Sequence, residues 1–248
     1  MLGLLRFDFF AMRKKMATFV CLLLPAICAL LVILVTSYAE GRHAGLSFVD
    51  VFISNMEMIR LNFAIYFVLL LHHDRKKGYI KNVSGTLKRK YFYILSKAIV
   101  LSIFVLISFL LLALTAWLGC LLAFGSCGAF EAFTFGVYFG VNYILMIGSM
   151  CLLMFVTLLL RNIAGSITFA VLYIVGLLPE LIYGLLELLL AKMDMEFNFF
   201  NISVYRQMRA LTIGISGQDA WKAVTIAGVY ILLFGLLSCV LFHKRDTV

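Results

Sequence analysis

The residues most able to do chemistry are charged side chains inside an apolar stretch. Asp50, Glu57 and Arg60 lie within the run from Phe48 to Leu71. Arg60 lies 12 residues from Phe48, which is about 18 Å along a helix and close to the middle of a bilayer. Glu57 precedes Arg60 by three residues and can pair with it on one helical face, and Asp50 lies two turns from Glu57 on that face. Because charges in lipid are costly, the three either line a substrate route or form buried pairs that fix helix packing.

Two further acidic residues, Glu180 and Glu187, lie seven positions apart in the apolar segment that follows Gly176. Pro179 is expected to break this segment. We therefore predict short helices that dip back into the outer leaflet, within an outer region of residues 180–218. The two carboxylates are further candidates for a translocation path.

Enzymatic motifs are weak or absent. No GxxxxGK[ST] phosphate loop or HExxH pair occurs, so the chain itself is not predicted to hydrolyse ATP. Gly214-Ile215-Ser216-Gly217 matches the GxSG of rhomboid proteases, but the following apolar stretch has no histidine before His243 to serve as a base, and His43 is the one external candidate. His72-His73-Asp74 offers metal ligands that point in different directions on a helix. We predict neither a catalytic nor a metal site, and no cofactor in this chain.

Composition indicates the kind of element that holds these residues. Hydrophobic residues make up 64% of the 248-residue chain and charged residues 13%, against roughly 25% charged in soluble domains. The mean hydropathy is +1.08. Although the net charge is +9, the basic residues cluster beside apolar stretches, so membrane topology explains them better than a nucleic-acid partner does.

The fold class predicted is an all-α membrane protein of one domain, residues 1–248. A transmembrane helix needs about 20 apolar residues, and six stretches qualify. They are Ala17–Tyr38, Phe48–Leu71, Tyr91–Leu118, Phe133–Leu160, Ile163–Ile182 and Ala220–Phe242.

Basic residues predict the orientation in a cell membrane. Fifteen Lys and Arg fall on one side of the predicted spans and five on the other, so both termini are expected in the cytosol. In residues 1–16, apolar side chains recur at helical spacing with charges between them, at Leu2, Leu5, Phe9 and Met12. This pattern predicts a helix lying in the inner interface.

A strongly basic loop, residues 72–90, is predicted between the second and third spans. Tyr79, Ile80 and Val83 form an apolar edge at helical spacing, lysines surround it, and Gly85 can end the helix. Such a surface suits docking into a groove of a soluble protein. The alternative is a loop that only obeys topology and touches anionic lipid. The candidate coupling residues are Arg75, Lys76, Lys77, Gly78, Tyr79, Ile80, Lys81, Asn82 and Val83.

This organisation resembles the membrane subunits of ABC-2-type exporters over the whole chain. The stretch from Lys77-Gly78-Tyr79-Ile80-Lys81 to Lys88-Arg89-Lys90 and Ser96-Lys97 is similar to the inner loop of that family. Among its members, the chain looks most like small permeases of Gram-positive bacteria that export or expel antimicrobial peptides and toxins.

The resemblance implies a half-transporter that works with a separate ATPase subunit in a two-plus-two assembly. The ATPase would bind ATP and Mg, residues 75–83 would form the coupling helix, and the cargo would be an amphipathic or hydrophobic peptide. A second permease chain, identical or different, is also implied. Gly136 and Gly140 form a GxxxG that serves either this dimer or packing within one chain.

Two rival functions follow from the residues. An ion channel or secondary transporter would use Glu57 and Arg60 as coupling charges, although the chain lacks an evident inverted repeat. An intramembrane enzyme would use Ser216 or His72 as its reactive centre.

Overall fold

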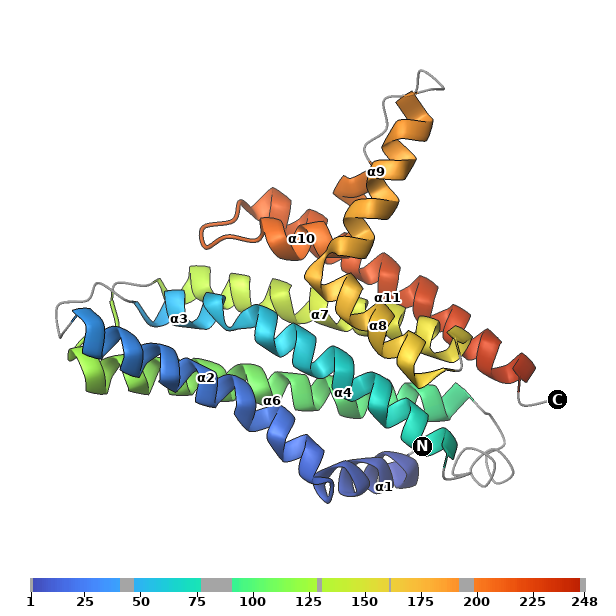
Figure 1. Cartoon of the computed structure of the whole chain (residues 1–248), viewed down its shortest axis with the longest axis horizontal. Helices are drawn as coiled ribbons and strands as arrows, with labels where there is room; N and C mark the ends of the chain where they lie inside the picture. Colours follow the sequence, from blue (N-terminus) through green and yellow to red (C-terminus); the bar gives the residue numbers. More distant parts are fainter. Residues whose placement is uncertain are drawn as a thin grey trace.

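The computed structural model describes residues 2–40, 47–76, 91–128, 131–160, 162–191 and 199–245. Helices make up 91% of it, and no strand occurs in these ranges. The helices form an elongated bundle with the N- and C-termini near the same end (Figure 1). They are α1 (Leu2–Arg13), α2 (Met16–Glu40), α3 (Phe48–Ser54), α4 (Met56–Lys76), α6 (Tyr91–Phe124), α7 (Ala132–Leu160), α8 (Ile163–Val175), α9 (Leu177–Ala191), η2 (Phe199–Ile202), α10 (Val204–Ala210) and α11 (Gly217–Arg245).

Five helical segments in the described ranges are long and apolar enough to cross a membrane, or six if the bent pair α8–α9 is one span. The prediction of an all-helical chain suited to a membrane is therefore confirmed. Four of the predicted spans correspond to single helices, α2, α6, α7 and α11. These helices run past one or both of the predicted bounds; α6, for example, continues through the apolar residues 119–124 to Phe124.

The second predicted span consists of two helices with a turn at Asn55. The Asn55 side chain donates to the Val51 carbonyl oxygen at 2.9 Å, which satisfies a backbone acceptor at the end of α3. At the other end, Ser47 and Asp50 form a capping box that starts α3. Helix α4 then continues to Lys76. Residues 72–76 are thus helical rather than part of the predicted loop, and residues 77–90 lie outside the described ranges.

The fifth predicted span is bent by 73° between α8 and α9. The break lies at Gly176, which has a φ of +99°, and not at Pro179 as predicted. Glycine adopts this left-handed conformation without the steric cost of a Cβ atom. Pro179 falls in the first turn of α9, where its missing N–H is not needed by the helix. As a result, α9 projects away from the bundle (Figure 1).

The closest helix pair is α7 and α11, which run in the same direction (Figure 1). A Cβ atom on Gly148 would lie 3.4 Å from the Ala227 carbonyl oxygen, so this glycine permits close approach of the two backbones. Nothing lies within 4 Å of a Cβ built on Gly136 or Gly140. Within the described ranges, the GxxxG face is therefore not used for packing inside one chain.

Candidate functional site

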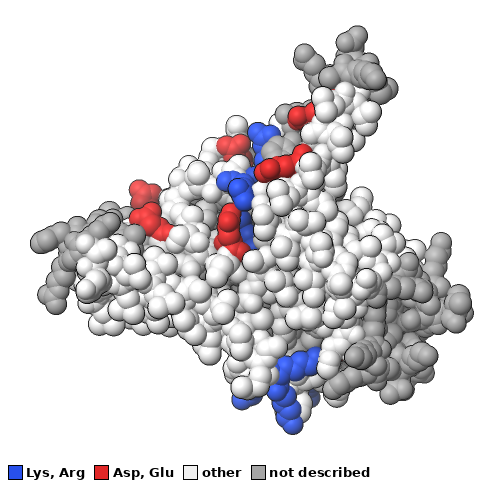
Figure 2. All heavy atoms as spheres, viewed as in Figure 1, with Lys and Arg blue, Asp and Glu red and all other residues white. Residues whose placement is uncertain are grey.

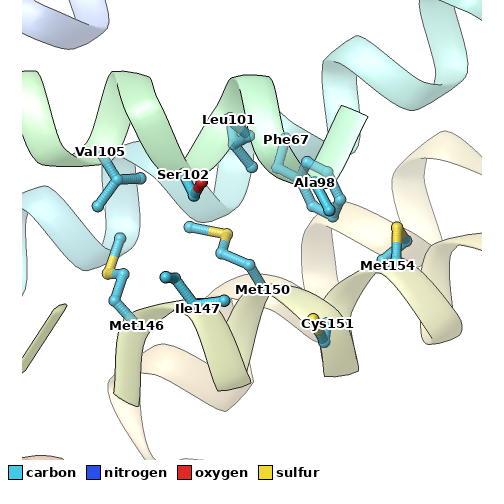
Figure 3. Close-up of a pocket in the computed structure, with 10 residues that line it drawn as sticks. All are labelled: Phe67, Ala98, Leu101, Ser102, Val105, Met146, Ile147, Met150, Cys151 and Met154. Atoms are coloured by element: carbon cyan, nitrogen blue, oxygen red, sulfur yellow. The ribbon is translucent and has the colours of Figure 1, made fainter. Parts of the chain in front are cut away.

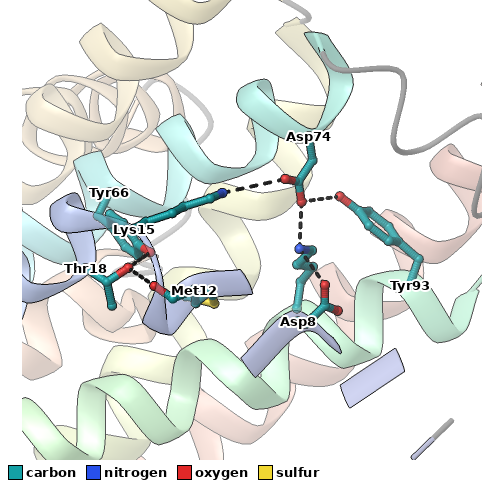
Figure 4. Close-up of polar contacts among 8 residues, drawn as sticks. Asp8, Met12, Lys15, Thr18, Tyr66, Asp74 and Tyr93 are labelled. Carbon is teal, nitrogen blue, oxygen red and sulfur yellow. Dashed lines mark hydrogen bonds and ion pairs between the residues drawn. The ribbon is translucent and has the colours of Figure 1, made fainter. Parts of the chain in front are cut away.

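Three charged side chains from three helices meet at the end of the bundle where the termini lie. The Lys97 Nζ of α6 lies 2.8 Å from the Asp8 Oδ1 of α1 and 2.6 Å from the Asp74 Oδ2 of α4 (Figure 4). The Lys97 side chain is only 3% exposed, and Asp8 is fully buried. One buried ammonium thus holds two carboxylates from elements that are far apart in the sequence.

Hydrogen bonds complete this network. The Ser96 hydroxyl donates to Asp8 Oδ2 at 2.6 Å, and the Tyr93 hydroxyl donates to Asp74 Oδ2 at 3.1 Å. Lys15 lies 3.8 Å from Asp74 Oδ1. Buried charges are tolerated when they are both paired and hydrogen-bonded. The network meets that condition for both carboxylates.

The spacing of residues on α6 explains why three members of the network lie together. Tyr93, Ser96 and Lys97 are at positions i, i+3 and i+4, so they share one helical face. Asp74 lies in the part of α4 that extends beyond the predicted end of the second span. No single stretch of sequence brings these groups together, because the network requires α1, α4 and α6 to meet.

The buried face of α1 differs from the predicted apolar face. Met12 is buried and Leu5 is partly buried, as expected, and Phe9 stacks on Phe104 with ring centroids 5.4 Å apart. Asp8, however, lies on the same inner face. The prediction counted this residue only as one of the charges between the apolar residues. It is buried because Lys97 and Ser96 of α6 supply its partners.

A second contact fixes the junction of α1 and α2. The Thr18 hydroxyl donates to the Met12 carbonyl oxygen at 2.7 Å and lies 2.5 Å from the Tyr66 hydroxyl of α4 (Figure 4). The turn between α1 and α2 is therefore attached to α4 as well. Helix α1 is held against α4 and α6 by polar contacts.

The network joins the two ends of the predicted coupling segment. Asp74 immediately precedes Arg75, and Tyr93 and Lys97 lie in the first turns of α6, after the segment. Arg75 and Lys76 are the last residues of α4, whereas Lys77 to Val83 lie outside the described ranges. Any displacement of this segment would act directly on α4 and α6, and on α1 through Asp8.

Arg60 is buried in the bundle, with 8% of its surface exposed. Its Nη2 donates to Asn142 Oδ1 of α7 at 2.7 Å and to the Met208 carbonyl oxygen of α10 at 3.3 Å. The predicted pair with Glu57 does not form. Arg60 instead links α4 to α7 and α10, which agrees with the packing interpretation of this charge.

The other predicted path residues have separate surroundings. Glu57 lies 3.6 Å from Arg209 Nε of α10, and both side chains are about half exposed or more, at 64% and 48%. Asp50 belongs to the cap of α3, where its Oδ2 accepts from the Ser47 hydroxyl at 2.6 Å. The structure therefore does not gather Asp50, Glu57 and Arg60 on one face, because the turn at Asn55 and the partners on α10 separate them.

Glu180 lies at the root of α9, where Tyr205 of α10 approaches it. The Tyr205 hydroxyl is 3.4 Å from Glu180 Oε1, and Arg209 Nη2 donates to the Val175 carbonyl oxygen at 3.2 Å. Burial raises the pKa of the Tyr205 hydroxyl above its ordinary value. Acidic and basic side chains lie side by side in this area (Figure 2). Glu187, farther along α9, is exposed.

The residues considered for enzymatic chemistry make contacts that are typical of helix ends and of helix packing. Ser216 accepts from the Asp219 amide at 3.2 Å and donates to Asp219 Oδ2 at 2.7 Å, which is a helix cap at the start of α11. His72 lies 3.2 Å from the Ser166 hydroxyl, while His73 faces outward. Across the described ranges, no group of three or more His, Cys, Asp or Glu is placed to hold a metal ion.

A small void between α6 and α7 is lined by methionines (Figure 3). Met146, Met150 and Met154 recur every four residues along α7 and face α6. The void has a volume of about 20 Å³, enough for one water molecule. It is far too small for a peptide, so it is a packing defect rather than a cargo site in this conformation.

Comparisons with protein-family models, curated proteins and solved structures found no match to this chain. The candidate site therefore rests on its geometry. Its most informative feature is the buried network beside the predicted coupling segment, residues 75–83, which we call the cationic segment.

Proposed function

We propose that this chain is the membrane subunit of an ATP-driven exporter that moves amphipathic or hydrophobic peptides. A separate ATPase would dock on residues 75–83, and a second permease chain would complete the assembly. The observation that carries the proposal is the buried network of Asp8, Asp74 and Lys97. It connects both ends of the cationic segment to three helices.

The network suits the transmission of force from a soluble partner. Because Lys97 holds carboxylates of α1 and α4 at 2.8 and 2.6 Å, the three helix ends would move together. Closure of the ATPase on ATP would push the segment between α4 and α6. The shift of α4 would then reach α8, which packs along it, and the break at Gly176.

The exposed faces of the bundle suit an apolar cargo. Leu181, Leu185 and Leu188 are more than half exposed along one face of α9. Glu180 and Glu187 lie on a neighbouring face of the same helix. An amphipathic peptide could contact such a face from the bilayer. The open Gly136 and Gly140 face of α7 would accept the second permease chain.

Co-purification with ATPase measurement tests this proposal. Full-length chain extracted gently from its native membrane should carry a protein that hydrolyses ATP. Tyr79→Ala with Ile80→Ala should release that protein and abolish peptide export, because the docking edge is lost. Gln218→Ala, at the start of α11, is the control and should change neither. Peptide movement by the purified chain alone, in liposomes without ATP, would contradict the proposal.

A further inference from the structure

A large cavity opens at the end of the bundle that carries the termini. It lies between the junction of α1 and α2, the last turns of α4, and the start of α8. Its volume is about 760 Å³, which falls in the roughly 300–1,000 Å³ range of small-molecule sites. The residues that define its chemistry are Lys15, Met16, Ala17, His73, Asn162 and Ile163.

One part of the lining carries positive charge and hydrogen-bond donors. Lys15 is partly exposed, and its ammonium has three N–H donors, so it can bind an anion while it keeps its contact with Asp74 at 3.8 Å. His73 is exposed at the same cavity. Lys and Arg side chains gather around the junction of α1 and α2 (Figure 2). An anionic group is the natural ligand of this part.

Much of the rest of the lining is apolar, and several of its side chains are exposed. Met16 is 81% exposed, and Leu69 and Ile163 are each more than 40% exposed. Beyond Met16, α2 continues with the exposed side chains of Phe19 and Leu23. A ligand that fits both parts must have an anionic head and hydrocarbon chains that can lie along α2 and α8.

We propose that this cavity binds the headgroup of an anionic phospholipid from the inner leaflet. The phosphate would contact Lys15 and His73, and the acyl chains would follow Met16 and Ile163. The proposal relies on the topology of the proposed function, which puts this end of the bundle at the inner leaflet. It does not require the ATPase. The cationic lining disfavours a cationic peptide at the same place.

A bound lipid would contact helices that the ion-pair network does not include. The network holds α1, α4 and α6, whereas the cavity is shared by the α1–α2 junction, α4 and α8. His72 of α4 already lies 3.2 Å from the Ser166 hydroxyl of α8, and the headgroup would strengthen this attachment of α8 to the end of the bundle that carries the termini. Lipid composition would in this way influence the helix that leads to the break at Gly176.

Native mass spectrometry of the purified full chain in detergent tests the site. Phosphatidylglycerol and phosphatidylcholine with identical acyl chains serve as probes. The unaltered chain should retain phosphatidylglycerol at least about tenfold more tightly, because its headgroup has a net negative charge, whereas the choline cation of phosphatidylcholine offsets the phosphate and is repelled by Lys15. Lys15→Gln with His73→Gln should remove this preference. Ala17→Phe, which places a bulky ring in the cavity without changing charge, should weaken it.

Lys14→Gln is the matched control. Lys14 is exposed and lies over the Phe10 ring at 4.4 Å, outside the cavity lining, so its variant should retain the preference. Equal loss in Lys14→Gln and in the cavity variants would overturn the proposal by showing general attraction to a basic surface. Equal retention of the two lipids by the unaltered chain would also overturn it, as would full displacement of phosphatidylglycerol by glycerol 3-phosphate at equal concentration.

Discussion

At the scale of single residues, Lys97 has the most consequential surroundings in the described part of the chain. It pairs with Asp8 and Asp74 at once, in a place where both carboxylates are largely or fully shielded from bulk water, and Lys15 supplies a second positive charge 3.8 Å from Asp74. The loss of one partner from a buried ionic group is far more damaging than the loss of the whole group, because the remaining charges stay desolvated.

Lys97→Ala should lower the free energy of unfolding by about 3–5 kcal/mol. Thermal or denaturant unfolding of the purified chain in detergent measures this change. Lys222→Ala is the control, because Lys222 is exposed on α11, and it should stay within about 0.5 kcal/mol of the unaltered chain. Similar small effects in both variants would show that the buried network does not hold the helices together.

Variants of Arg60 and Glu57 test whether each charge stabilises the fold or acts in transport. Arg60→Gln should destabilise the fold by more than about 2 kcal/mol, since it removes a buried charged donor from Asn142 and Met208. Glu57→Gln should cost less than about 1 kcal/mol, because its pair with Arg209 is exposed. Unfolding measurements on both variants provide the comparison. A stable Arg60→Gln chain with altered ion flux in liposomes would favour the channel hypothesis instead.

The sequence identified these two residues but not their partners. Spacing along a helix shows that Glu57 and Arg60 can meet, yet it does not show that α10 folds back far enough for Met208 to reach Arg60. The burial of Asp8 could not be predicted for the same reason. Asp8 follows Leu5 by three residues and precedes Met12 by four, so it shares their helical face. Its partner Lys97 lies 89 positions away in the chain, and spacing within α1 does not reveal that partner.

At the scale of elements, the break between α8 and α9 depends on Gly176. A residue with a Cβ atom would be strained at a φ of +99° and would overlap the Tyr205 hydroxyl. The sequence predicted a broken segment here but placed the break at Pro179. Proline has a known local effect, whereas the left-handed conformation of one glycine among several becomes evident only from the path of the backbone.

Gly176→Ala should destabilise the chain by more than about 1–2 kcal/mol, the usual cost of the left-handed conformation before any overlap is counted. Gly184→Ala provides a matched control in α9. Nothing lies within 4 Å of a Cβ at Gly184, so alanine should stabilise the helix there by up to about 1 kcal/mol. Unfolding in detergent measures both. Equal effects of the same sign would refute this account of the break.

Long apolar helices were the most predictable elements. Hydropathy over about 20 residues is a local property, so the starts of α6 at Tyr91 and α8 at Ile163 agree with prediction. The turn at Asn55 was not predicted, because a single asparagine in an apolar run is compatible with a continuous helix. Its role depends on the hydrogen bond to Val51.

At the scale of the whole molecule, the account requires that the cationic segment and both termini share one side of the membrane. Single cysteines in a chain whose native cysteines are replaced by serine test this topology. Lys77→Cys should react with a membrane-impermeant maleimide only after the cells are opened. Gln218→Cys should react in intact cells. The reverse pattern would place the coupling segment outside and exclude a cytosolic ATPase.

The central claim is that an ATPase acts on the segment between α4 and α6, and photocrosslinking from position 79 in living cells tests it most directly. A photoreactive amino acid replaces Tyr79, and the crosslinked product is probed with photoreactive ATP. The account predicts one adduct that binds ATP and disappears when Ile80 is also changed to alanine. An adduct that contains only lipid, or a partner that binds no ATP, would contradict it.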